Sequence, residues 1–305
     1  MTVSEPLFSV VIPAYNYAEK IARAVESVVA QLDQASADLL VVDDGSTDQT
    51  LEVLEQLQTK HNGRFRVISK PNGGSASARN RGIEETSGQY LIFLDADDEM
   101  APGALAVLAQ HIEGYPTTRM VAGAYWSVFD SGKQRLRPAS SFPGGARERV
   151  QAYLLKKTVV LSNGACAMHR EVFAHGVYPE NFRSAEDIPV FAQALARFSC
   201  TTVEQPLVLI HKHAGSLRHN LEFARESGLA LVDEVFSEQR MPAELQDLKR
   251  SFVAQRCASL FRTFYSAGER DTALEFYKDA LRADWRLIAN WSYTRKAIKL
   301  LLRGR

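Results

Sequence analysis

Three carboxylates follow directly on one apolar run of the sequence. Residues 91–94 read Leu-Ile-Phe-Leu, and Asp95, Asp97 and Asp98 come next. A short continuous apolar run of this kind is typical of a buried strand. Acids gathered at a strand end repel one another and lose solvation, so a basic side chain or a hard divalent cation is expected beside them. Asp95 and Asp97 are therefore candidate metal ligands, unless the acids only solubilise the turn.

Three other apolar runs end in polar residues in the same way, and apolar residues at helical spacing follow them. The runs are 8–12, 39–42 and 65–68, and the polar clusters after them are 13–16, 43–46 and 70–74. Alternating short strands and amphipathic helices predict an α/β fold with a mostly parallel central sheet between two helical layers. Because ligands of such sheets bind at the carboxyl ends of the strands, the four polar clusters are expected to meet at one edge and to face a ligand.

Positive charge and glycine near this edge favour a phosphorylated ligand. Lys70, Arg79 and Arg81 supply the charge, and Gly73 with Gly74 would let backbone amides approach a bound anion. Alternatively, the glycines only form a tight turn and the arginines belong to a solvated helix face. Neither a GxxxxGK[ST] loop nor a GxGxxG fingerprint follows the first apolar run, so a nucleotide would be held by side chains.

The composition is that of a globular chain without a strong average charge. Lys plus Arg and Asp plus Glu both number 36, and 46% of the 305 residues are apolar. A balanced charge gives no reason to expect nucleic acid as a partner. Three widely spaced cysteines in no CxxC pattern argue against a disulfide scaffold or a zinc ribbon. The start of the sequence lacks the basic and apolar regions of a secretion signal, so we expect a cytoplasmic protein.

Four segments together resemble the motifs of family 2 glycosyltransferases, in the family's order and spacing. They read Val-Val-Ile-Pro-Ala-Tyr-Asn at 10–16, Val-Val-Asp-Asp-Gly-Ser-Thr-Asp at 41–48, Asn-Gly-Gly-Ser-Ala-Ser-Ala-Arg-Asn-Arg-Gly at 72–82 and Phe-Leu-Asp-Ala-Asp-Asp at 93–98. The resemblance is most specific over 8–98. It implies a GT-A fold, which is an αβα sandwich that holds a nucleotide sugar and a divalent metal, Mn²⁺ or Mg²⁺.

The resemblance also assigns roles to residues of the predicted edge. The acids of the Asp-Ala-Asp triplet would contact the donor's ribose and the metal, and a histidine after the run 207–210 would close over the metal and the diphosphate. A loop histidine is also a common surface residue. The implied metal ligands are Asp97, Asp95 and His213. The implied donor contacts are Pro13, Ala14, Tyr15, Asp43, Asp44, Ser46, Asn72, Arg79, Asp95 and Ala96.

A second acidic pair, Glu186 and Asp187, precedes apolar residues at helical spacing and therefore marks a helix start. An acid at this place can serve simply as a helix cap. The resemblance instead makes Asp187 the general base for the acceptor hydroxyl, with Glu186 keeping it basic enough. One base and a metal-stabilised leaving group, without a second carboxylate nucleophile in the pattern, imply inversion at the sugar carbon.

The predicted activity is transfer of a sugar from a nucleotide-diphosphate donor to a hydroxyl of a glycan or lipid-linked acceptor. We expect a UDP-sugar, with a dTDP-sugar as the alternative, and a role in envelope polysaccharide or lipopolysaccharide-type synthesis. Two other functions share the ligand: a nucleotide-sugar-binding protein without transferase activity, and a sugar nucleotidyltransferase. The glycine-rich loop of a nucleotidyltransferase is missing after 8–12.

The sequence divides into a GT-A domain at 1–219, with a donor half at about 1–100 and an acceptor half at about 101–219, and a helical region at 220–305. Helices are predicted there at 221–238, 243–266, 270–283 and 285–302. The last one combines tryptophans with basic residues. That combination suits peripheral contact of 285–305 with an anionic membrane surface at the inner face of the membrane. The alternative is that its apolar side packs on the protein.

Overall fold

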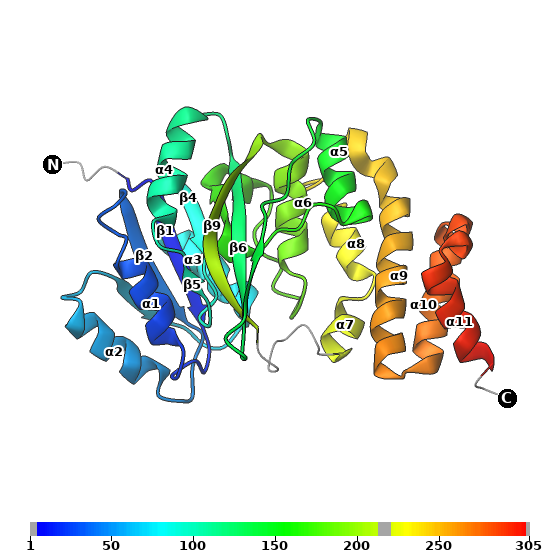
Figure 1. The fold of residues 1–305 in the computed structure, drawn as a ribbon, viewed down its shortest axis with the longest axis horizontal. Helices are drawn as coiled ribbons and strands as arrows, with labels where there is room; N and C mark the ends of the chain where they lie inside the picture. Colours follow the sequence, from blue (N-terminus) through cyan, green and yellow to red (C-terminus); the bar gives the residue numbers. More distant parts are fainter. Residues whose placement is uncertain (1–4, 213–220, 303–305) are drawn as a thin grey trace.

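The central strand of the N-terminal half is β1 (Phe8–Ala14), and all of its residues are buried. The structure is a computed structural model that describes residues 5–212 and 221–302 (Figure 1). Strand β1 pairs in parallel with β2 (Ala37–Asp43) on one side and with β4 (Tyr90–Phe93) on the other, and β3 (Arg66–Ser69) extends the sheet beyond β2. The four strands expected at 8–12, 39–42, 65–68 and 90–94 are therefore confirmed, and their carboxyl ends lie at one edge.

The second half of the sheet mixes strand directions. Strand β8 (Cys166–His169) runs antiparallel between β4 and β6 (Met120–Phe129), while β9 (Cys200–Lys212) runs parallel to β6. Two short strands, β5 (Glu99–Met100) and β7 (Gln134–Arg137), pair antiparallel with β9 and β6. Six of the nine strands formed by the described residues, β1, β2, β3, β4, β6 and β9, thus point the same way, and the mostly parallel sheet is confirmed.

Helices cover both faces of the sheet, because successive side chains of its strands point to opposite sides. Val10 and Ile12 of β1 belong to one hydrophobic cluster and Val11 to another. The first cluster includes α1 (Ile21–Val29), α2 (Thr50–Lys60) and α4 (Ala104–Gly114). The second includes α3 (Ser75–Glu85), α5 (Ala146–Val150), the π-helix η1 (Gln151–Lys156) and α6 (Asp187–Arg197). Two short 3₁₀ turns, η2 (Asn163–Ala165) and η3 (Arg170–His175), flank β8.

Helix α3 approaches β1 unusually closely at Gly82. A β-carbon on this glycine would lie 2.3 Å from Cγ1 of Val11, so no larger residue fits without a shift of the strand or the helix. The close contact places the first two turns of α3, which carry Ser75 and Arg79, beside the carboxyl edge of the sheet.

The C-terminal region consists of helices that continue the second cluster and then form one of their own. They are α7 (Leu221–Ser227), α8 (Ala230–Val235), η5 (Ala243–Leu248), α9 (Lys249–Ala267), α10 (Arg270–Ala283), η6 (Trp285–Ala289) and α11 (Trp291–Leu302). The helix predicted at 221–238 is divided at Gly228, and the one predicted at 285–302 is divided at Asn290. No helix in the described part of the chain is both long and apolar enough to span a bilayer.

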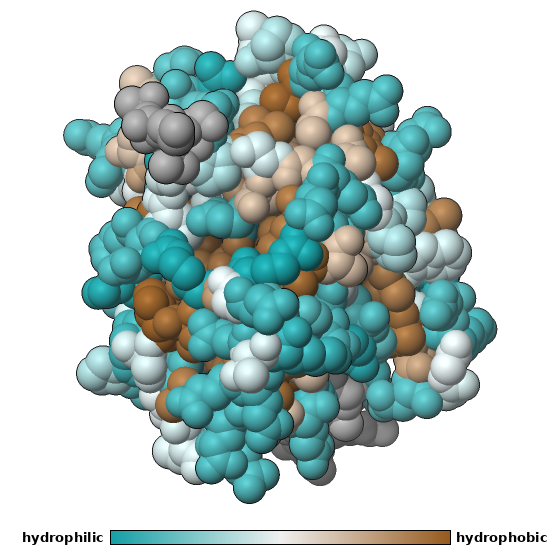
Figure 2. Space-filling model, turned by 90° about the vertical axis from the view of Figure 1, so that its left-hand side faces the viewer, coloured by the Kyte–Doolittle hydropathy of each residue, from teal (hydrophilic) through white to brown (hydrophobic). Residues whose placement is uncertain are grey.

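Seen from the side of α1 and α2, most of the surface is hydrophilic, and hydrophobic residues show in patches between hydrophilic ones (Figure 2). The opposite end of the molecule is formed by α9, α10 and α11 (Figure 1).

Candidate functional site

The loops after β1 and β2 are joined by hydrogen bonds at the carboxyl edge. The backbone N–H of Asn16 donates to Oγ of Ser46 at 2.9 Å, and Oδ1 of Asn16 accepts from the N–H of Thr47 at 2.8 Å. Asn16 has a φ of +58°, a left-handed conformation that asparagine tolerates better than most residues. A hollow of about 560 Å³ opens beside these loops, and it is lined by Asn16, Tyr17, Ala18, Glu19, Lys20, Asp48 and Gln49.

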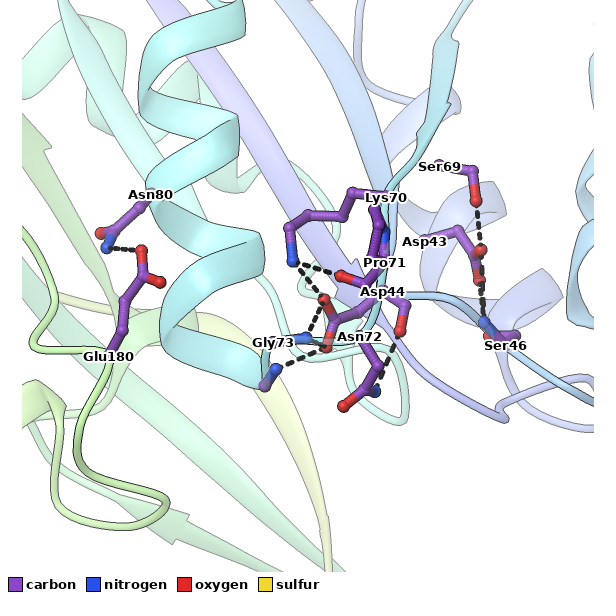
Figure 3. A network of polar contacts seen from close by, with 11 residues as sticks. Asp43, Asp44, Ser46, Ser69, Lys70, Pro71, Asn72, Gly73, Asn80 and Glu180 are labelled. Atoms are coloured by element: carbon purple, nitrogen blue, oxygen red, sulfur yellow. Dashed lines mark hydrogen bonds and ion pairs between the residues drawn. The ribbon is translucent and has the colours of Figure 1, made fainter.

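The buried carboxylate of Asp44, in the loop after β2, holds the loop that follows β3 (Figure 3). It accepts from Nζ of Lys70 at 2.7 Å and from the backbone N–H of Gly74 at 2.6 Å, and the N–H of Gly73 also points to it. Nδ2 of Asn72 donates to the backbone oxygen of Asp44 at 3.0 Å. Asp44 is therefore the centre of a network that fixes the loop 70–74 at the start of α3.

The positive groups expected for a bound anion already have partners within the chain. The Gly73 and Gly74 amides and Lys70 bind Asp44, so the chain's own carboxylate takes the place expected for a phosphate. Arg81 pairs with Glu85 on the exposed side of α3, as in the alternative of a solvated helix face. The adjacent acid Asp43 accepts from Oγ of Ser69 at 2.8 Å.

The three acids after β4 differ in exposure. Asp95 and Asp97 are half-buried and Asp98 is buried. Asp98 accepts from the backbone N–H of His211 at 2.8 Å, which ties the acidic turn to the end of β9. Burial, and then the charges of Asp95 and Asp97, raises the pKa of Asp98 to about 8. Burial together with the same acids also raises the pKa of Tyr17 above its ordinary value, so its phenol remains protonated beside them.

The acidic turn fits a hard divalent cation in its donor chemistry. Carboxylate oxygens are the ligands that Mg²⁺ and Mn²⁺ prefer, and Asp95 and Asp97 present two of these groups with one residue between them. Within 5–212 and 221–302, no three His, Cys, Asp or Glu side chains converge to hold a metal by themselves. A cation at Asp95 and Asp97 would therefore take further oxygens from a ligand or water. The predicted ligand His213 lies outside the described residues.

Arg79 joins the acidic turn after β4 to the start of α6. Its Nη2 donates to Oδ1 of Asp95 at 2.9 Å, and its Nη1 donates to Oε1 of Glu186 at 2.7 Å. The guanidinium also stacks over the ring of Tyr178, with 5.3 Å between Cζ and the ring centroid. Burial alone would lower the pKa of Arg79, but the charges of Asp95 and Glu186 raise it above its ordinary value. A permanently charged side chain thus connects loops that are far apart in the sequence.

Glu186 and Asp187 lie at the start of α6, as predicted, and their environments separate their acidities. Burial would raise the pKa of Glu186, but the charge of Arg79 and hydrogen bonds from Arg79 and Ser75 hold it below its ordinary value. Burial and the negative charge of Glu186 raise the pKa of Asp187 to about 6. Glu186 makes no side-chain cap to the helix. A carboxylate that titrates near 6 suits a general base at neutral pH.

The backbone before this pair is strained. Ala185 has a φ of +65°, a left-handed conformation that residues with a β-carbon rarely adopt. Such strain persists only where surrounding contacts impose it. Here the ion pair of Glu186 with Arg79 and the burial of α6 are those contacts.

Most residues expected at the site meet at the carboxyl edge or directly beside it. Those at the strand ends and in the loops that follow them are Pro13, Ala14, Tyr15, Asp43, Asp44, Ser46, Asn72, Asp95, Ala96 and Asp97. Arg79 brings Glu186 and Asp187 to them from α6.

Three residues were missed by the sequence reasoning. Tyr17 could have been noticed as an aromatic residue in the loop after β1, and Ser75 as the first residue of the helix after the glycine pair. Nothing in the local sequence marks Tyr178, whose place under Arg79 depends on the tertiary fold.

Comparisons with known proteins find relatives of this chain in sequence and in structure. The sequence profile of the family described as Glycosyl transferase family 2 matches residues 9–176, more than half of the chain. A segment of 102 residues is 47% identical to the chondroitin synthase of Pasteurella multocida (strain Pm70), and it makes up 33% of this chain and 10% of that protein. The chain therefore spans a small part of the length of that relative.

Two solved structures are similar over nearly the whole chain. S. aureus TarS 1–349 in complex with UDP-GlcNAc has a TM-score of 0.69 and 20% identity, with 96% of this chain and 88% of that one covered. The mannosyltransferase PcManGT from Pyrobaculum calidifontis, in complex with GDP-Man and Mn²⁺, has a TM-score of 0.57 and 17% identity, with 99% and 87% covered. These likenesses confirm the GT-A fold, and the profile match shows that the chain belongs to glycosyl transferase family 2.

Proposed function

We propose that this protein is an inverting glycosyltransferase that moves a sugar from a nucleotide-diphosphate donor to a hydroxyl group. The arrangement around Arg79 carries the proposal. It brings Asp95 of the donor side and Glu186 of the acceptor side to one guanidinium, and it lies beside Asp187, whose pKa is raised to about 6. A protein that only bound a nucleotide sugar would not need such a base.

A UDP-sugar is the donor that we favour, with a dTDP-sugar as the alternative. Tyr15 lies at the end of β1 with 45% of its surface exposed, so its ring can stack on a base. Asp43 and Asp44 hold together the loops after β2 and β3, which lie on one side of it. The similarity to TarS, which was solved with UDP-GlcNAc, supports a uridine nucleotide, while the other neighbour was solved with GDP-Man.

In the proposed reaction Asp187 accepts the proton of the acceptor hydroxyl. The oxygen then forms a bond to the anomeric carbon as the bond from that carbon to the diphosphate oxygen breaks, and the electron pair leaves with the nucleoside diphosphate. Glu186 is held ionised by Arg79 and Ser75, so its charge keeps Asp187 basic. Attack opposite to the leaving group inverts the configuration of the sugar carbon.

A divalent cation held by Asp97 and Asp95 would stabilise the negative charge of the leaving diphosphate. Arg79 would keep Asp95 oriented, since it binds one oxygen of that carboxylate. The acceptor that we propose is a glycan or a lipid-linked sugar in envelope polysaccharide or lipopolysaccharide-type synthesis.

The proposal is tested by separating donor binding from transfer. A panel of nucleotide sugars with Mn²⁺ identifies the donor by thermal stabilisation, because a ligand that binds only the folded state raises its stability. We expect Asp187→Asn to keep this stabilisation and to lower the rate of transfer by about a hundredfold or more. We expect Asp97→Ala to lose the part of the stabilisation that depends on the metal.

Asp130→Asn is the matched control, because Asp130 is an exposed acid in the turn after β6. It should leave both donor binding and transfer unchanged. Transfer by Asp187→Asn at the wild-type rate would remove Asp187 as the base. Donor binding without any transfer by the wild-type protein, across the acceptors of the class proposed, would favour the binding-protein alternative.

A further inference from the structure

Large exposed hydrophobic residues are concentrated at one end of the chain. Twelve such residues occur in the described part, and six of them lie within residues 285–302, the segment that forms η6 and α11. Trp285 is 74% exposed, Trp291 67% and Leu302 70%. Scattered single residues of this kind need no explanation, but a cluster marks an interaction surface.

Helix α11 has two different faces. Ala297 is buried, and Tyr293 and Leu300 pack with it against α9 and α10. The opposite side carries Trp291, Ile298 and Leu302, which follow one another at helical spacing and remain exposed. The alternative that the apolar side of this helix packs on the protein therefore holds for the face around Ala297. It does not hold for the face that carries Trp291, Ile298 and Leu302.

Five of these exposed residues are called the C-terminal stripe below: Trp285, Ile288, Trp291, Ile298 and Leu302. The segment that holds it, 285–302, contains four basic residues and no acidic one, although the whole chain has no net charge. Arg295 and Lys299 lie exposed on α11 beside the stripe. Neither has an acidic partner among the described residues.

We propose that the C-terminal stripe docks on an anionic lipid surface. Tryptophan side chains are favoured at the boundary between headgroups and acyl chains, and Lys and Arg beside them are attracted to anionic headgroups. A second copy of this chain fits less well, because a two-fold contact would bring Arg295 and Lys299 near their own copies with no acid in the segment to pair with them. The surface is independent of the proposed transferase activity.

The test uses the full chain and vesicles of phosphatidylcholine with or without phosphatidylglycerol. A Trp126→Phe background leaves only Trp285 and Trp291 to report, since the chain has three tryptophans. With anionic vesicles we expect co-sedimentation and a blue shift of tryptophan emission, both weakened by added salt. Vesicles of phosphatidylcholine alone should bind weakly.

Two independent sets of variants locate the surface. Trp285→Ser with Trp291→Ser should weaken binding to anionic vesicles by about tenfold or more, and it is read by co-sedimentation. Arg295→Glu with Lys299→Glu should weaken it by at least about thirtyfold, because each basic residue near an anionic surface contributes about fivefold. All four side chains are exposed, so both variants should melt like the wild type.

Controls are matched for chemistry. Lys133→Glu with Arg135→Glu reverses two exposed basic residues at the β6–β7 turn, and Tyr115→Ser removes an aromatic residue that is 56% exposed. Both should bind vesicles like the wild type. The proposal is overturned if the wild type does not bind anionic vesicles, or if the stripe variants bind as well as the controls. It is also overturned if sedimentation shows a dimer that only the stripe variants abolish, in the absence of lipid binding.

Discussion

At the scale of single residues, the site depends on one arginine that donates hydrogen bonds to two different carboxylates. Arg79 pairs with Asp95 and with Glu186, and the second pair leaves Asp187 as the carboxylate that titrates near neutral pH. Two adjacent acids thereby obtain different roles. Glu186 is the ionised neighbour whose charge raises the pKa of Asp187, and Asp187 is the proposed base.

This division predicts a specific pH profile. Asp187 must be ionised to accept a proton, and its pKa is raised to about 6, so the transfer rate should fall as the pH is lowered through about 6. Glu186→Gln removes the negative neighbour and leaves Arg79 without this partner. Both changes favour the charged form of Asp187, and we expect the acid limb of the rate profile to move down by about one pH unit.

The control for this shift is Glu180→Gln. Glu180 accepts from Nδ2 of Asn80 (Figure 3), and its charge is not among the causes that raise the pKa of Asp187, so its loss should leave the midpoint near pH 6 unchanged. Measurement of the rate at saturating donor between about pH 4.5 and 9 distinguishes the two variants. An unchanged midpoint in Glu186→Gln would mean that Glu186 does not set the basicity of Asp187.

At the scale of elements, the position of α3 against β1 holds Arg79 in place, and Gly82 makes that position attainable. Gly82→Ala adds a methyl group whose carbon would lie 2.3 Å from Cγ1 of Val11. Alanine is the better helix former by about 1 kcal/mol, but overpacking a buried contact costs about 1–3 kcal/mol. We expect a net loss of unfolding free energy, measured by denaturant titration, and partial recovery when Val11→Ala is added.

Gly114→Ala is the natural comparison, because Gly114 ends α4 and nothing lies within 4 Å of its added β-carbon. That variant should be as stable as the wild type or slightly more stable. If both alanine variants gain stability, then the contact between α3 and β1 is not tight in solution.

Many of the helices and strands could be predicted from the sequence, because apolar periodicity reflects burial. The apolar runs at 8–12 and 39–42 are observed as the buried strands β1 (Phe8–Ala14) and β2 (Ala37–Asp43). Strand β9 begins at Cys200, well before the expected run 207–210, because the polar residues Thr201, Thr202 and Glu204 hide its start. Their backbone pairs with β6, and this pairing is a tertiary interaction that no local pattern records.

At the site, too, local sequence patterns did not reveal the tertiary contacts. The sequence placed the acids of Asp43, Asp44, Asp95 and Asp97 at strand ends, and the structure places them there. It could not show that Asp44 turns inward to the amides of Gly73 and Gly74, because a carboxylate and a phosphate are equally good partners for such amides.

At the scale of the whole molecule, the boundary expected near residue 220 does not separate two hydrophobic cores. Eight buried apolar residues after it belong to the same cluster as α3 and α6. They are Leu231, Val232, Val235, Phe236, Met241, Leu245, Leu248 and Phe252. The later part of α9 packs instead with α10 and α11, where Phe261 and Phe264 form a cluster of their own.

Two truncations follow from this division of the core. Each fully buried side chain of this kind contributes about 1.5–3 kcal/mol, and a domain is stable by only about 5–15 kcal/mol. A chain of residues 1–219 should therefore lose cooperative thermal unfolding.

A chain of residues 1–284 lacks only Ala297 and its half-buried neighbours from the smaller cluster, so it should unfold cooperatively at a melting temperature lowered by a few degrees. It should also keep its stabilisation by donor while losing binding to anionic vesicles. Circular dichroism melts and vesicle sedimentation of both chains provide the measurement, and cooperative unfolding of 1–219 at the full-length temperature would show that α8 and α9 are not part of the catalytic core.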